Sequence, residues 1–305
     1  MTERTLRRLD PGADASGPSQ DFLDSARRRG LLHEIDGRRC VAGHCVEPVT
    51  GHRVLFAPFV EPALAESPDS LRSVLARAAG ARKPTRVTLR VDPWIELPHP
   101  WWLRQTYLCL RVCPPPSREE REAGTPNLEP IDGVRIRQAA DDDSPLVRAW
   151  LARALVDGHD QFGETADRGR VDAAVDALLA SPSRRTLVAV RDGNPVGHAT
   201  MDVDARDSVL GTRFVELFDI LVEQDARHRE IVRSLAATCT AHAAELGRPL
   251  VGNVVHRHPT GEDHGRHVVA RLRDNGWMPL YRYWSADPAA VLSTATRVSG
   301  VTRRG

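Results

Sequence analysis

The feature that most constrains the fold is an apolar stretch that runs through a basic turn into a helix. Residues 213–224 read RFVELFDILVEQ, with large apolar side chains on both faces, which predicts a central strand of a sheet. The turn that follows, 225–230, reads DARHRE and contains no glycine. An amphipathic helix then ends at Gly247, a suitable C-terminal cap. Its apolar residues near one face are Ile231, Leu235, Cys239 and Leu246.

The segment around this unit has the element order of a mixed sheet with helices. From residue 133 the pattern predicts strand, helix, helix, hairpin, strand, helix, strand, helix and strand. Ser144-Pro145 after Asp143 marks a helix start, and Asp192-Gly193 joins the strands of the hairpin. The last strand, 279–286, is expected to close the sheet. The predicted class is therefore α/β, as an α+β mixed sheet.

The N-terminal half repeats this plan in a shorter form. Stretches 38–48 and 53–62 read as paired strands, 70–80 as a helix and 85–93 as another strand. The stretch 107–112, YLCLRV, could close this smaller sheet.

A proline-rich, charged stretch separates the two halves. Residues 113–130 read CPPPSREEREAGTPNLEP, a composition typical of interdomain linkers. We therefore divide the chain into an N-terminal lobe (1–115), a linker (116–130), a second domain (131–288) and a flexible tail (289–305).

Charge and hydropathy limit the functional classes. Lys and Arg number 42 and Asp and Glu 41, so the net charge of +1 gives no bulk indication of a nucleic-acid binder. The N-terminal residues lack the apolar core of a signal peptide, and no apolar run is long enough to span a bilayer. We expect a soluble, cytoplasmic protein without membrane contact.

The cysteines do not predict a metal site. Five cysteines in a chain of this length do not indicate a disulfide framework. Cys40 and Cys45 are five apart, which places them on opposite faces of a regular strand, and Cys109 and Cys113 form a second strand-like pair. We expect ordinary small thiols and no metal.

The element order, together with LVEQDARHREIVRSLAATCTAHAAELG and the later LRDNGW, resembles the GNAT superfamily of N-acyltransferases over residues 133–287. The N-terminal half resembles a truncated, degenerate lobe of the same kind without a phosphate loop. The resemblance thus implies a tandem GNAT-like acyltransferase fold in which the N-terminal lobe helps to frame a cleft.

The resemblance also implies a donor site at the turn. In the family, a loop of pattern Arg/Gln-x-x-Gly-x-Gly/Ala and the helix N-terminus hold the pyrophosphate of coenzyme A through backbone N–H groups. Here the two glycine positions fall on Glu230 and Val232, where side chains intrude and Glu230 adds negative charge. Nearby arginines and the helix dipole could offset that charge. The donor-binding residues carried over are Leu221, Val222, Arg227, His228, Arg229, Ile231, Val232 and Arg233.

Two acids in the apolar strand are the candidate bases. A buried carboxylate is costly unless it is paired, and burial raises its pKa toward the working range of a general base. In the family the base is often a Glu on or beside this strand, which favours Glu216 first and Asp219 second. The alternative is a structural pair with an arginine or a hydroxyl of a neighbouring strand.

The expected general acid of the family is absent from its usual position. A tyrosine often lies four residues before a Gly-aromatic pair, but here Leu272 precedes Gly276-Trp277. Tyr281, or Tyr283 beside it, could substitute, and we assign Tyr281 as the catalytic candidate. The alternative is that both tyrosines only pack in the sheet.

A histidine-rich segment is the candidate acceptor site. Residues 256–267 read HRHPTGEDHGRH, and His256 and His258 share a face if the preceding strand continues. The break at 259–261 leaves no fixed metal-ligand geometry, so we expect a histidine to reach the acceptor instead.

Three functions remain open on this sequence. The first is acyl transfer from an activated donor to a small-molecule amine. The default donor is acyl-CoA, which acts as a cosubstrate, and no cofactor is expected. The second is transfer from aminoacyl-tRNA or an acyl carrier protein, as in Fem-type transferases with two GNAT-like lobes. The third is a non-catalytic GNAT-like binding module. The acyl group, the acceptor and the oligomeric state are not specified.

Overall fold

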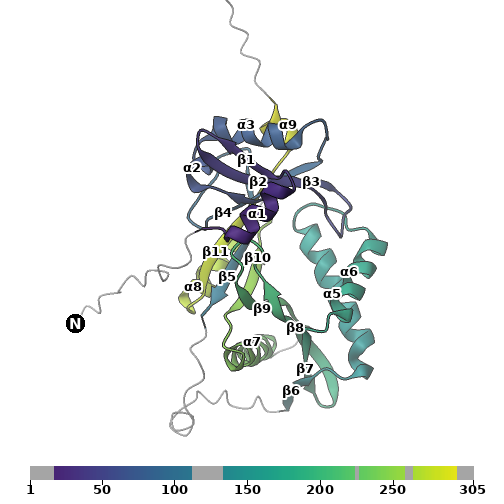
Figure 1. The fold of residues 1–305 in the computed structure, drawn as a ribbon. Coiled ribbons are helices and arrows are strands. Elements are labelled where there is room, and N and C mark those ends of the chain that lie inside the picture. The colour runs from purple at the N-terminus through teal and green to yellow at the C-terminus, as the bar shows by residue number, and fades with distance from the viewer. Residues whose placement is uncertain (1–16, 112–132, 224–226, 258–263, 294–305) are drawn as a thin grey trace, which may run out of the picture.

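A computed structural model describes residues 17–111, 133–223, 227–257 and 264–293 (Figure 1). Within this part of the chain all eleven strands join one sheet, in the order β1-β2-β3-β4-β11-β5-β10-β9-β8-β7-β6. The strands are β1 Leu32–Ile35, β2 Arg38–Val46, β3 Arg53–Val60, β4 Arg86–Val91, β5 Trp102–Leu110, β6 Val134–Gln138, β7 Arg184–Arg191, β8 Asn194–Arg206, β9 Arg213–Val222, β10 Leu250–Val255 and β11 Met278–Ala286. The helices are α1 Gln20–Arg28, α2 Pro62–Ala65, α3 Pro68–Ala79, the 3-10 turn η1 Asp141–Asp143, α5 Ser144–Asp160, α6 Arg168–Ala180, α7 His228–Glu245, α8 His264–Asp274 and α9 Pro288–Leu292.

The element order predicted after residue 133 is confirmed. It runs β6, α5, α6, β7, β8, β9, α7, β10, α8 and β11, and β9 lies inside the sheet as predicted. Helix α5 begins at Ser144, and the β7–β8 turn places Asp192 and Gly193 at φ of 50° and 83°, the left-handed backbone that tight hairpins require. Strand β9 is antiparallel to β8 and parallel to β10, so the sheet is mixed.

The predicted elements of the N-terminal half are also present. Strands β2 and β3 form an antiparallel pair, and α3 leads to β4, which is parallel to β3. Helix α1 and strand β1 precede them and were not expected from the sequence.

The two strands expected to close their own sheets instead join the halves. Strand β11 lies between β4 and β5, and β5 lies between β11 and β10, each pairing antiparallel with both neighbours. The prediction that 107–112 and 279–286 close separate sheets is therefore wrong. Each half gives its last strand to the other, which leaves no free edge between them and buries both strands in one continuous sheet.

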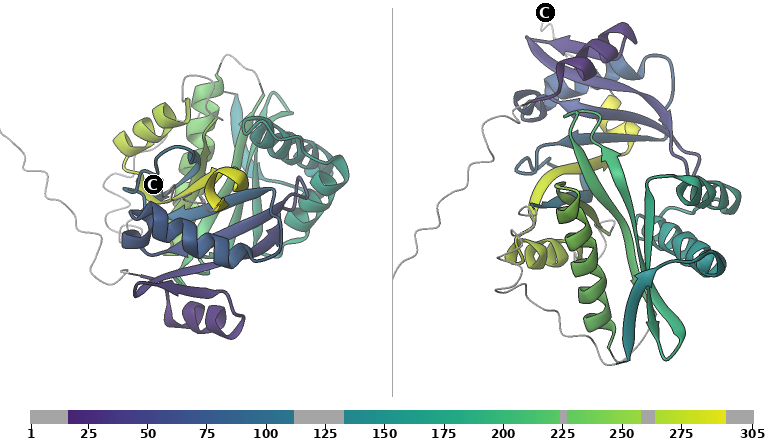
Figure 2. Two further views of the ribbon diagram at one scale, coloured as in Figure 1. Left: turned by 90° about the horizontal axis from the view of Figure 1, so that it is seen from above. Right: turned by 60° about the horizontal axis from the view of Figure 1, so that its bottom comes forward.

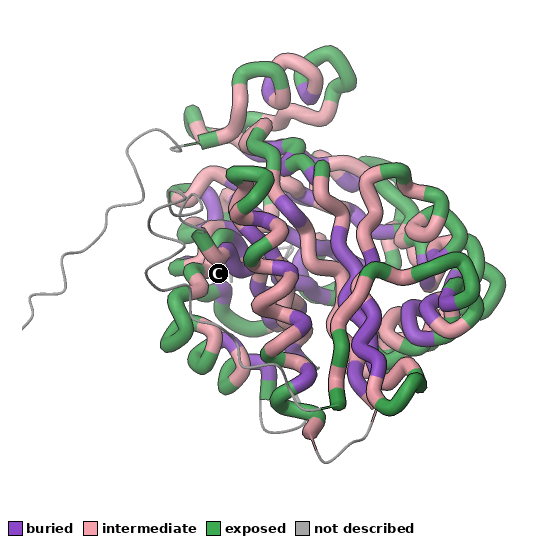
Figure 3. The backbone as a smooth tube through the Cα atoms, turned by 90° about the horizontal axis from the view of Figure 1, so that it is seen from below, coloured by how far each residue is buried: buried purple, intermediate pink, exposed green. Residues whose placement is uncertain are grey.

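Helices cover the sheet on both faces. Helices α3 and α9 pack on the N-terminal strands and α7 on the C-terminal strands, against the face that carries Leu89, Trp284 and Val215. On the opposite face α1 covers β2 and β3, while α5 and α6 cover the strands around β7 (Figure 2). Figure 3 shows buried positions concentrated in the strands and on the inner sides of the helices.

Helix α7 follows its predicted face with one exception. Ile231, Leu235 and Cys239 are fully buried, but Leu246 is 41% exposed. The helix ends at Glu245 and the chain turns at Gly247, where φ is 60°, so Leu246 lies past the last turn and buried Ala243 takes the fourth apolar place.

The chain ends differ from expectation at one point. The linker 116–130 lies outside the described residues. Helix α9 occupies the start of the expected tail, and its Val291 is buried in the N-terminal core beside α3. Among the described residues, no helix has the length and apolar character needed to cross a bilayer.

Candidate active site

A β-bulge in β9 brings the two strand acids to the same face of the sheet. Glu216 lies opposite Asp202 of β8, and Asp219 lies opposite Thr200, so three residue steps on β9 match two on β8. In a regular strand, residues three apart point to opposite faces, and the extra residue of a bulge cancels that difference. Phe218 is the extra residue, and both carboxylates point away from α7.

Glu216 lies in an environment that favours its protonated form. Burial, and secondly the negative charge of Asp202 across the strand pair, raise the pKa of Glu216 to about 7. A carboxyl group with this pKa is half ionised near neutral pH and can both accept and return a proton.

All three tyrosines of the chain meet on the face that carries Glu216. Glu216 is in register with Val251 of β10, which pairs with Cys109 of β5. Tyr107 is two residues from Cys109, so the strand register places it on that face. The rings of Tyr107 and Tyr281 stack with centroids 4.7 Å apart.

Tyr283 completes this tyrosine cluster, which consists of Tyr107, Tyr281 and Tyr283. Its ring centroid lies 5.5 Å from that of Tyr107 and 5.6 Å from that of Tyr281, both edge to face. Burial is the main cause that raises the pKa of all three phenols, that of Tyr283 to about 12, and the charge of Glu216 contributes for Tyr107 and Tyr283. The cluster therefore stays protonated at neutral pH and can donate hydrogen bonds.

A buried ion pair holds the cluster from the N-terminal side. Arg90 of β4 is in register with Tyr283 and lies over the Tyr281 ring, 3.6 Å from its centroid. The same guanidinium donates two hydrogen bonds of 2.9 and 2.6 Å to Asp207, in the loop after β8. Both halves of the chain thus contribute to one polar site.

Asp219 has a partner in the neighbouring strand. Its Oδ2 lies 3.4 Å from Nε2 of His198, which is fully buried and stacks on Trp150 of α5 with ring centroids 5.2 Å apart. The other ring nitrogen of His198 lies 3.1 Å from the Thr200 hydroxyl. The partner of Asp219 is therefore a histidine and not the arginine or hydroxyl considered from the sequence, the contact is longer than an ordinary hydrogen bond, and the Asp219 side chain remains 25% exposed.

The β9 and β10 strands separate beyond this site. Their pairing spans only Val215–Leu217 and Leu250–Gly252, although β9 continues to Val222 and β10 to Val255. Beyond Leu217, β9 keeps its partner β8 on the other side. The backbone of β9 from Phe218 onward thus faces a gap between two diverging strands.

The sequence-predicted donor residues lie at the end of β9 and the start of α7. Leu221 and Val222 end the strand, residues 224–226 lie outside the described part, and α7 begins at His228. The side chain of Ile231 is fully buried, and that of Val232 packs against the same core. The exposed residues of this end are His228, Arg229, Glu230 and Arg233.

Some polar groups in the first turn of α7 already have hydrogen-bond or charge partners within that turn. The N–H groups of Glu230 and Ile231 donate to the Arg227 carbonyl at 2.9 and 3.0 Å. The Glu230 carboxylate lies 4.0 Å from Arg227 Nε and complements the positive end of the helix dipole. A phosphate at this helix end would therefore compete with an internal carboxylate.

His256 lies apart from the tyrosine cluster. Its ring is 2% exposed, Nε2 is 2.9 Å from the Thr106 hydroxyl, and Gly265 of α8 covers it so closely that a Cβ there would lie 2.7 Å from Nδ1. Thr106 alternates with Tyr107 along β5, which places it on the other face of the sheet. His258 lies outside the described residues.

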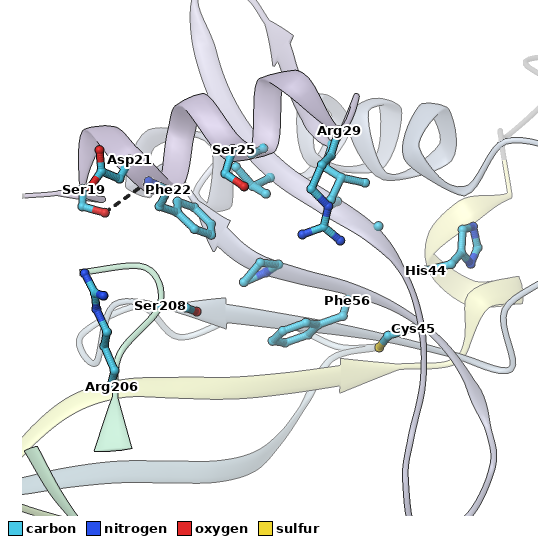
Figure 4. A pocket seen from close by; sticks show the side chains of 16 residues that line it. Ser19, Asp21, Phe22, Ser25, Arg29, His44, Cys45, Phe56, Arg206 and Ser208 are labelled. Atoms are coloured by element: carbon cyan, nitrogen blue, oxygen red, sulfur yellow. Dashed lines mark hydrogen bonds between the residues drawn. The ribbon is translucent and has the colours of Figure 1, made fainter. Parts of the chain in front are cut away.

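Two adjoining cavities open over the polar face. The larger, of about 550 Å³, lies under α1, with Phe22 and Arg29 above and Phe56 below (Figure 4). A second cavity of about 360 Å³ shares Cys45 and Phe56 with it and is also lined by Tyr283. Since Tyr283 belongs to the tyrosine cluster, the second cavity leads to the candidate active site.

Sequence reasoning missed the residues that the N-terminal half contributes. Tyr107 and Arg90 are far from β9 along the chain, and only the strand exchange brings them close to it. The signal available was that the chain has only three tyrosines, two of them in the predicted last strand. His198 was equally unmarked, because its partner Asp219 becomes a neighbour only through the bulge.

The fold and this site define a GNAT-type α/β domain, with a bulged strand that diverges from its parallel neighbour and leads into a helix. Residues 148–256 match the family model of the Acetyltransferase (GNAT) family. The C-terminal part of the chain thus carries a GNAT acetyltransferase domain, as the resemblance implied.

Solved structures of this kind are similar to the chain at low identity. A GCN5-related N-acetyltransferase from Kribbella flavida is 16% identical, with 87% of this chain and 94% of that one covered and a TM-score of 0.45. A GNAT-family acetyltransferase from Colwellia psychrerythraea is 10% identical, with 84% of each chain covered and a TM-score of 0.45. A ribosomal-protein-alanine N-acetyltransferase from Brucella melitensis biovar Abortus 2308 is 23% identical. The match covers 46% of this chain and 90% of that one, with a TM-score of 0.31. No curated protein matches the chain significantly.

Proposed function

We propose that the protein is an N-acyltransferase that moves an acyl group from acyl-CoA to an amine, with Glu216 as general base. The observation that carries this proposal is the register of β9, β10 and β5, which places Glu216, with a pKa of about 7, on the face that holds the three protonated tyrosines. The GNAT match over residues 148–256 supports the reaction class.

The base has a defined task in this reaction. A free amine is mostly protonated at neutral pH and must lose a proton before its nitrogen can attack the thioester carbonyl. Ionised Glu216 accepts that proton. The amine nitrogen then forms the new C–N bond, and the carbonyl oxygen carries negative charge until the C–S bond breaks.

Two groups of the chain serve the other steps. Backbone N–H groups of β9 beyond Leu217 face the gap toward β10 and can donate to the carbonyl oxygen. As the C–S bond breaks, the departing sulfur takes the second proton of the attacking nitrogen, and Tyr281, whose ring Arg90 fixes in place, donates a hydrogen bond to that sulfur. Asp219, paired with His198, holds a second carboxylate beside the path of the acceptor.

The donor would enter along the gap between β9 and β10, with its phosphates at the start of α7. Arg229 and Arg233 are exposed there and supply positive charge, while Glu230 opposes it. This charge balance favours donor binding that is weaker than that of a glycine loop.

A donor screen tests the proposal. The purified chain is incubated with a series of acyl-CoA thioesters and a panel of primary amines, and acylated products are detected by mass spectrometry. We expect a new amide and an equal amount of free coenzyme A. Product formed only from aminoacyl-tRNA, with strong salt dependence, would reassign the donor, and binding without any transfer would make the chain a non-catalytic module.

A further inference from the structure

A fully buried histidine points at Asp219 from the neighbouring strand. His198 of β8 is 0% exposed, and its Nε2 lies 3.4 Å from Oδ2 of Asp219. Neither atom has a hydrogen-bond partner of ordinary length among the described residues, so each faces only the other. Asp219 lies opposite Thr200, two residues from His198, which makes the pair diagonal neighbours on one face of the sheet.

The orientation of the His198 ring is fixed by Trp150 of α5. The two rings are nearly parallel, at an angle of 2°, with centroids 5.2 Å apart. Trp150 is itself buried, and its Nε1 donates a hydrogen bond of 2.7 Å to Glu223, the residue after β9. An anchored indole against its face keeps the imidazole directed at Asp219.

A chain of hydrogen bonds assigns the proton of the neutral ring to Nε2. Arg184 Nη1 can only donate, and its partner at 2.9 Å is Thr186 Oγ1. The Thr186 hydroxyl lies 3.1 Å from that of Thr200, which lies 3.1 Å from Nδ1 of His198. Both threonines are buried, and both of their hydroxyl hydrogens are used in this chain only if Thr186 donates to Thr200 and Thr200 donates to Nδ1. Nδ1 is then an acceptor, and the hydrogen on Nε2 points at Asp219.

This arrangement leaves one oxygen of Asp219 available to a ligand. Oδ2 is buried against His198, whereas the side chain as a whole is 25% exposed, so Oδ1 is the oxygen that a ligand can reach. Glu216 lies on the same face. Because their partners Asp202 and Thr200 are two residues apart on β8, Glu216 and Asp219 are separated by one strand repeat, about 7 Å.

The charges on this part of the face do not balance. Asp202, Glu216 and Asp219 lie together, and the charge of Asp202 contributes to the raised pKa of Glu216. Arg184 lies opposite Asp202 on β7, but its Nε and Nη1 donate to the Leu179 carbonyl and the Thr186 hydroxyl. With both aspartates ionised, one arginine leaves this group at a net charge of −1 when Glu216 is protonated and −2 when it is ionised. A cation is the ligand that such a site attracts.

We infer that Asp219, positioned by His198, binds the ammonium group of the acyl acceptor through Oδ1. The acceptor thus arrives in its protonated form, and Glu216, one strand repeat away, takes the proton from the same nitrogen. His198 is a positioning residue, because it acts only through Asp219. The role in catalysis rests on the proposed function, whereas the tautomer of His198 and the binding of a cation can be measured without turnover.

Nuclear magnetic resonance of the full chain labelled with ¹⁵N-histidine tests the site directly. His198→Gln identifies the resonances of His198, and Thr200→Val, which should shift the same resonances, identifies them if that variant does not fold. We expect a proton on Nε2 and none on Nδ1 in the neutral ring. n-Butylammonium chloride should shift the Nε2 resonance, while n-butanol with potassium chloride at equal ionic strength should leave it in place. A proton on Nδ1, or the same response to both probes, would overturn the inference.

Kinetics then separate binding from chemistry. With an amine identified by the donor screen, Asp219→Asn should raise the KM for the amine about tenfold or more and leave kcat and the KM for acyl-CoA nearly unchanged, as expected for loss of a charge-assisted contact. Asp204→Asn is the matched control. It removes an equal charge from β8, but Asp204 pairs with Arg213 and Arg248, so the KM for the amine should not change. A fall in kcat at unchanged KM would contradict the assigned role.

The positioning role of His198 has its own readout. Thr200→Val removes the hydroxyl that donates to Nδ1, and we expect the KM for the amine to rise by about three- to tenfold, as for the loss of one hydrogen bond. Thr200→Ser keeps the hydroxyl and should restore the wild-type KM. Equal KM values in Thr200→Val and Thr200→Ser would show that the chain is only structural. Binding of n-butylammonium without any acyl transfer would reject the proposed function and leave the ammonium site in place.

Discussion

The guanidinium of Arg90 lies over the ring of Tyr281 at 3.6 Å from its centroid, so a strand of the N-terminal half directly supports a residue of the candidate active site. The same group pairs through two hydrogen bonds with Asp207, whose side chain is 5% exposed. This contact joins the two halves at the point where their strands are exchanged.

Loss of this pair should destabilise the fold. Arg90→Met leaves Asp207 buried without its cation, which typically costs about 3–5 kcal/mol of unfolding free energy. Chemical denaturation measures the change. Arg148→Met is the control, because the Arg148–Asp176 pair is 41% and 60% exposed and should contribute at most about 1 kcal/mol. A cost for Arg90→Met no larger than for the control would show that the pair does not hold the halves together.

Asp202 should set the pH range of Glu216. Asp202→Asn removes the negative charge across the strand pair, so the pKa of Glu216 falls below about 7 and ionised base persists to lower pH. The rising limb of kcat/KM should shift to lower pH. Asp204→Asn, two residues away and exposed, should leave that limb in place. A limb that is the same in both variants would mean that Asp202 does not act on the titrating group.

Stability should depend on pH through the same group. The pKa of Glu216 rises from an ordinary value of 4.5 to about 7 on folding, so the folded chain binds its proton more tightly than the unfolded chain. The corresponding stabilisation is complete below pH 4.5 and is lost as pH rises through about 7. Glu216→Gln should remove this part of the pH dependence in denaturation curves. An unchanged slope between these pH values would place the raised pKa elsewhere.

Glu230 should weaken the binding of coenzyme A. Its carboxylate lies at the first turn of α7, where the phosphates would bind, and we expect a wild-type dissociation constant weaker than about micromolar. Glu230→Gln should tighten binding by about three- to tenfold, since it removes like-charge repulsion on the order of 1 kcal/mol. Glu245→Gln at the other end of α7 is the control and should change nothing. Submicromolar affinity of the wild type would show that the glycine-free turn adapts to the phosphates.

Gly197 of β8 should be required for the close approach of the end of β9. A Cβ at this position would lie 2.7 Å from the Leu221 carbonyl oxygen and 2.9 Å from Val222 Cα, and neither backbone atom can move freely. Gly197→Ala should therefore cost about 1–3 kcal/mol of unfolding free energy.

Gly158 provides the matched comparison. It lies in helix α5 and a Cβ there meets nothing within 4 Å. Gly158→Ala should stabilise the chain by roughly 0.5–1 kcal/mol through helix propensity. An unchanged unfolding free energy in Gly197→Ala would mean that β8 and β9 separate easily beside the turn that leads into α7.

The element order could be predicted from the sequence because each element carries its own local signal. The helix start at Ser144, the hairpin turn at Asp192 and the C-terminal cap at Gly247 are all set by residues within one turn. The exchange of β5 and β11 could not be predicted, since alternation shows that a stretch is a strand but not which strand it pairs with. Both strands carry apolar and polar side chains on each face, a pattern that does not favour one sheet over the other.

The site was predictable in part for the same reason. The sequence shows an acid at position 216 within an apolar strand. Burial in such a strand predicts that the pKa of this acid is raised. The bulge at Phe218 leaves no mark in VELFDILV, so the shared face of Glu216 and Asp219 was hidden. The contribution of Tyr107 depends on strand pairing across more than a hundred residues and is a property of the assembled sheet.

The most direct test of this account is the rate of acyl transfer by Glu216→Gln. The substitution keeps shape and volume but removes the base. With an acyl-CoA and amine pair identified by the donor screen, kcat/KM is measured from pH 5 to pH 9 for the wild type and the variant, and folding of both is checked by circular dichroism. We predict a wild-type profile that rises through about pH 7 and a folded variant about a hundredfold or more slower without that rise. Wild-type turnover in a folded Glu216→Gln protein would contradict the account and leave Asp219 as the second candidate base on β9.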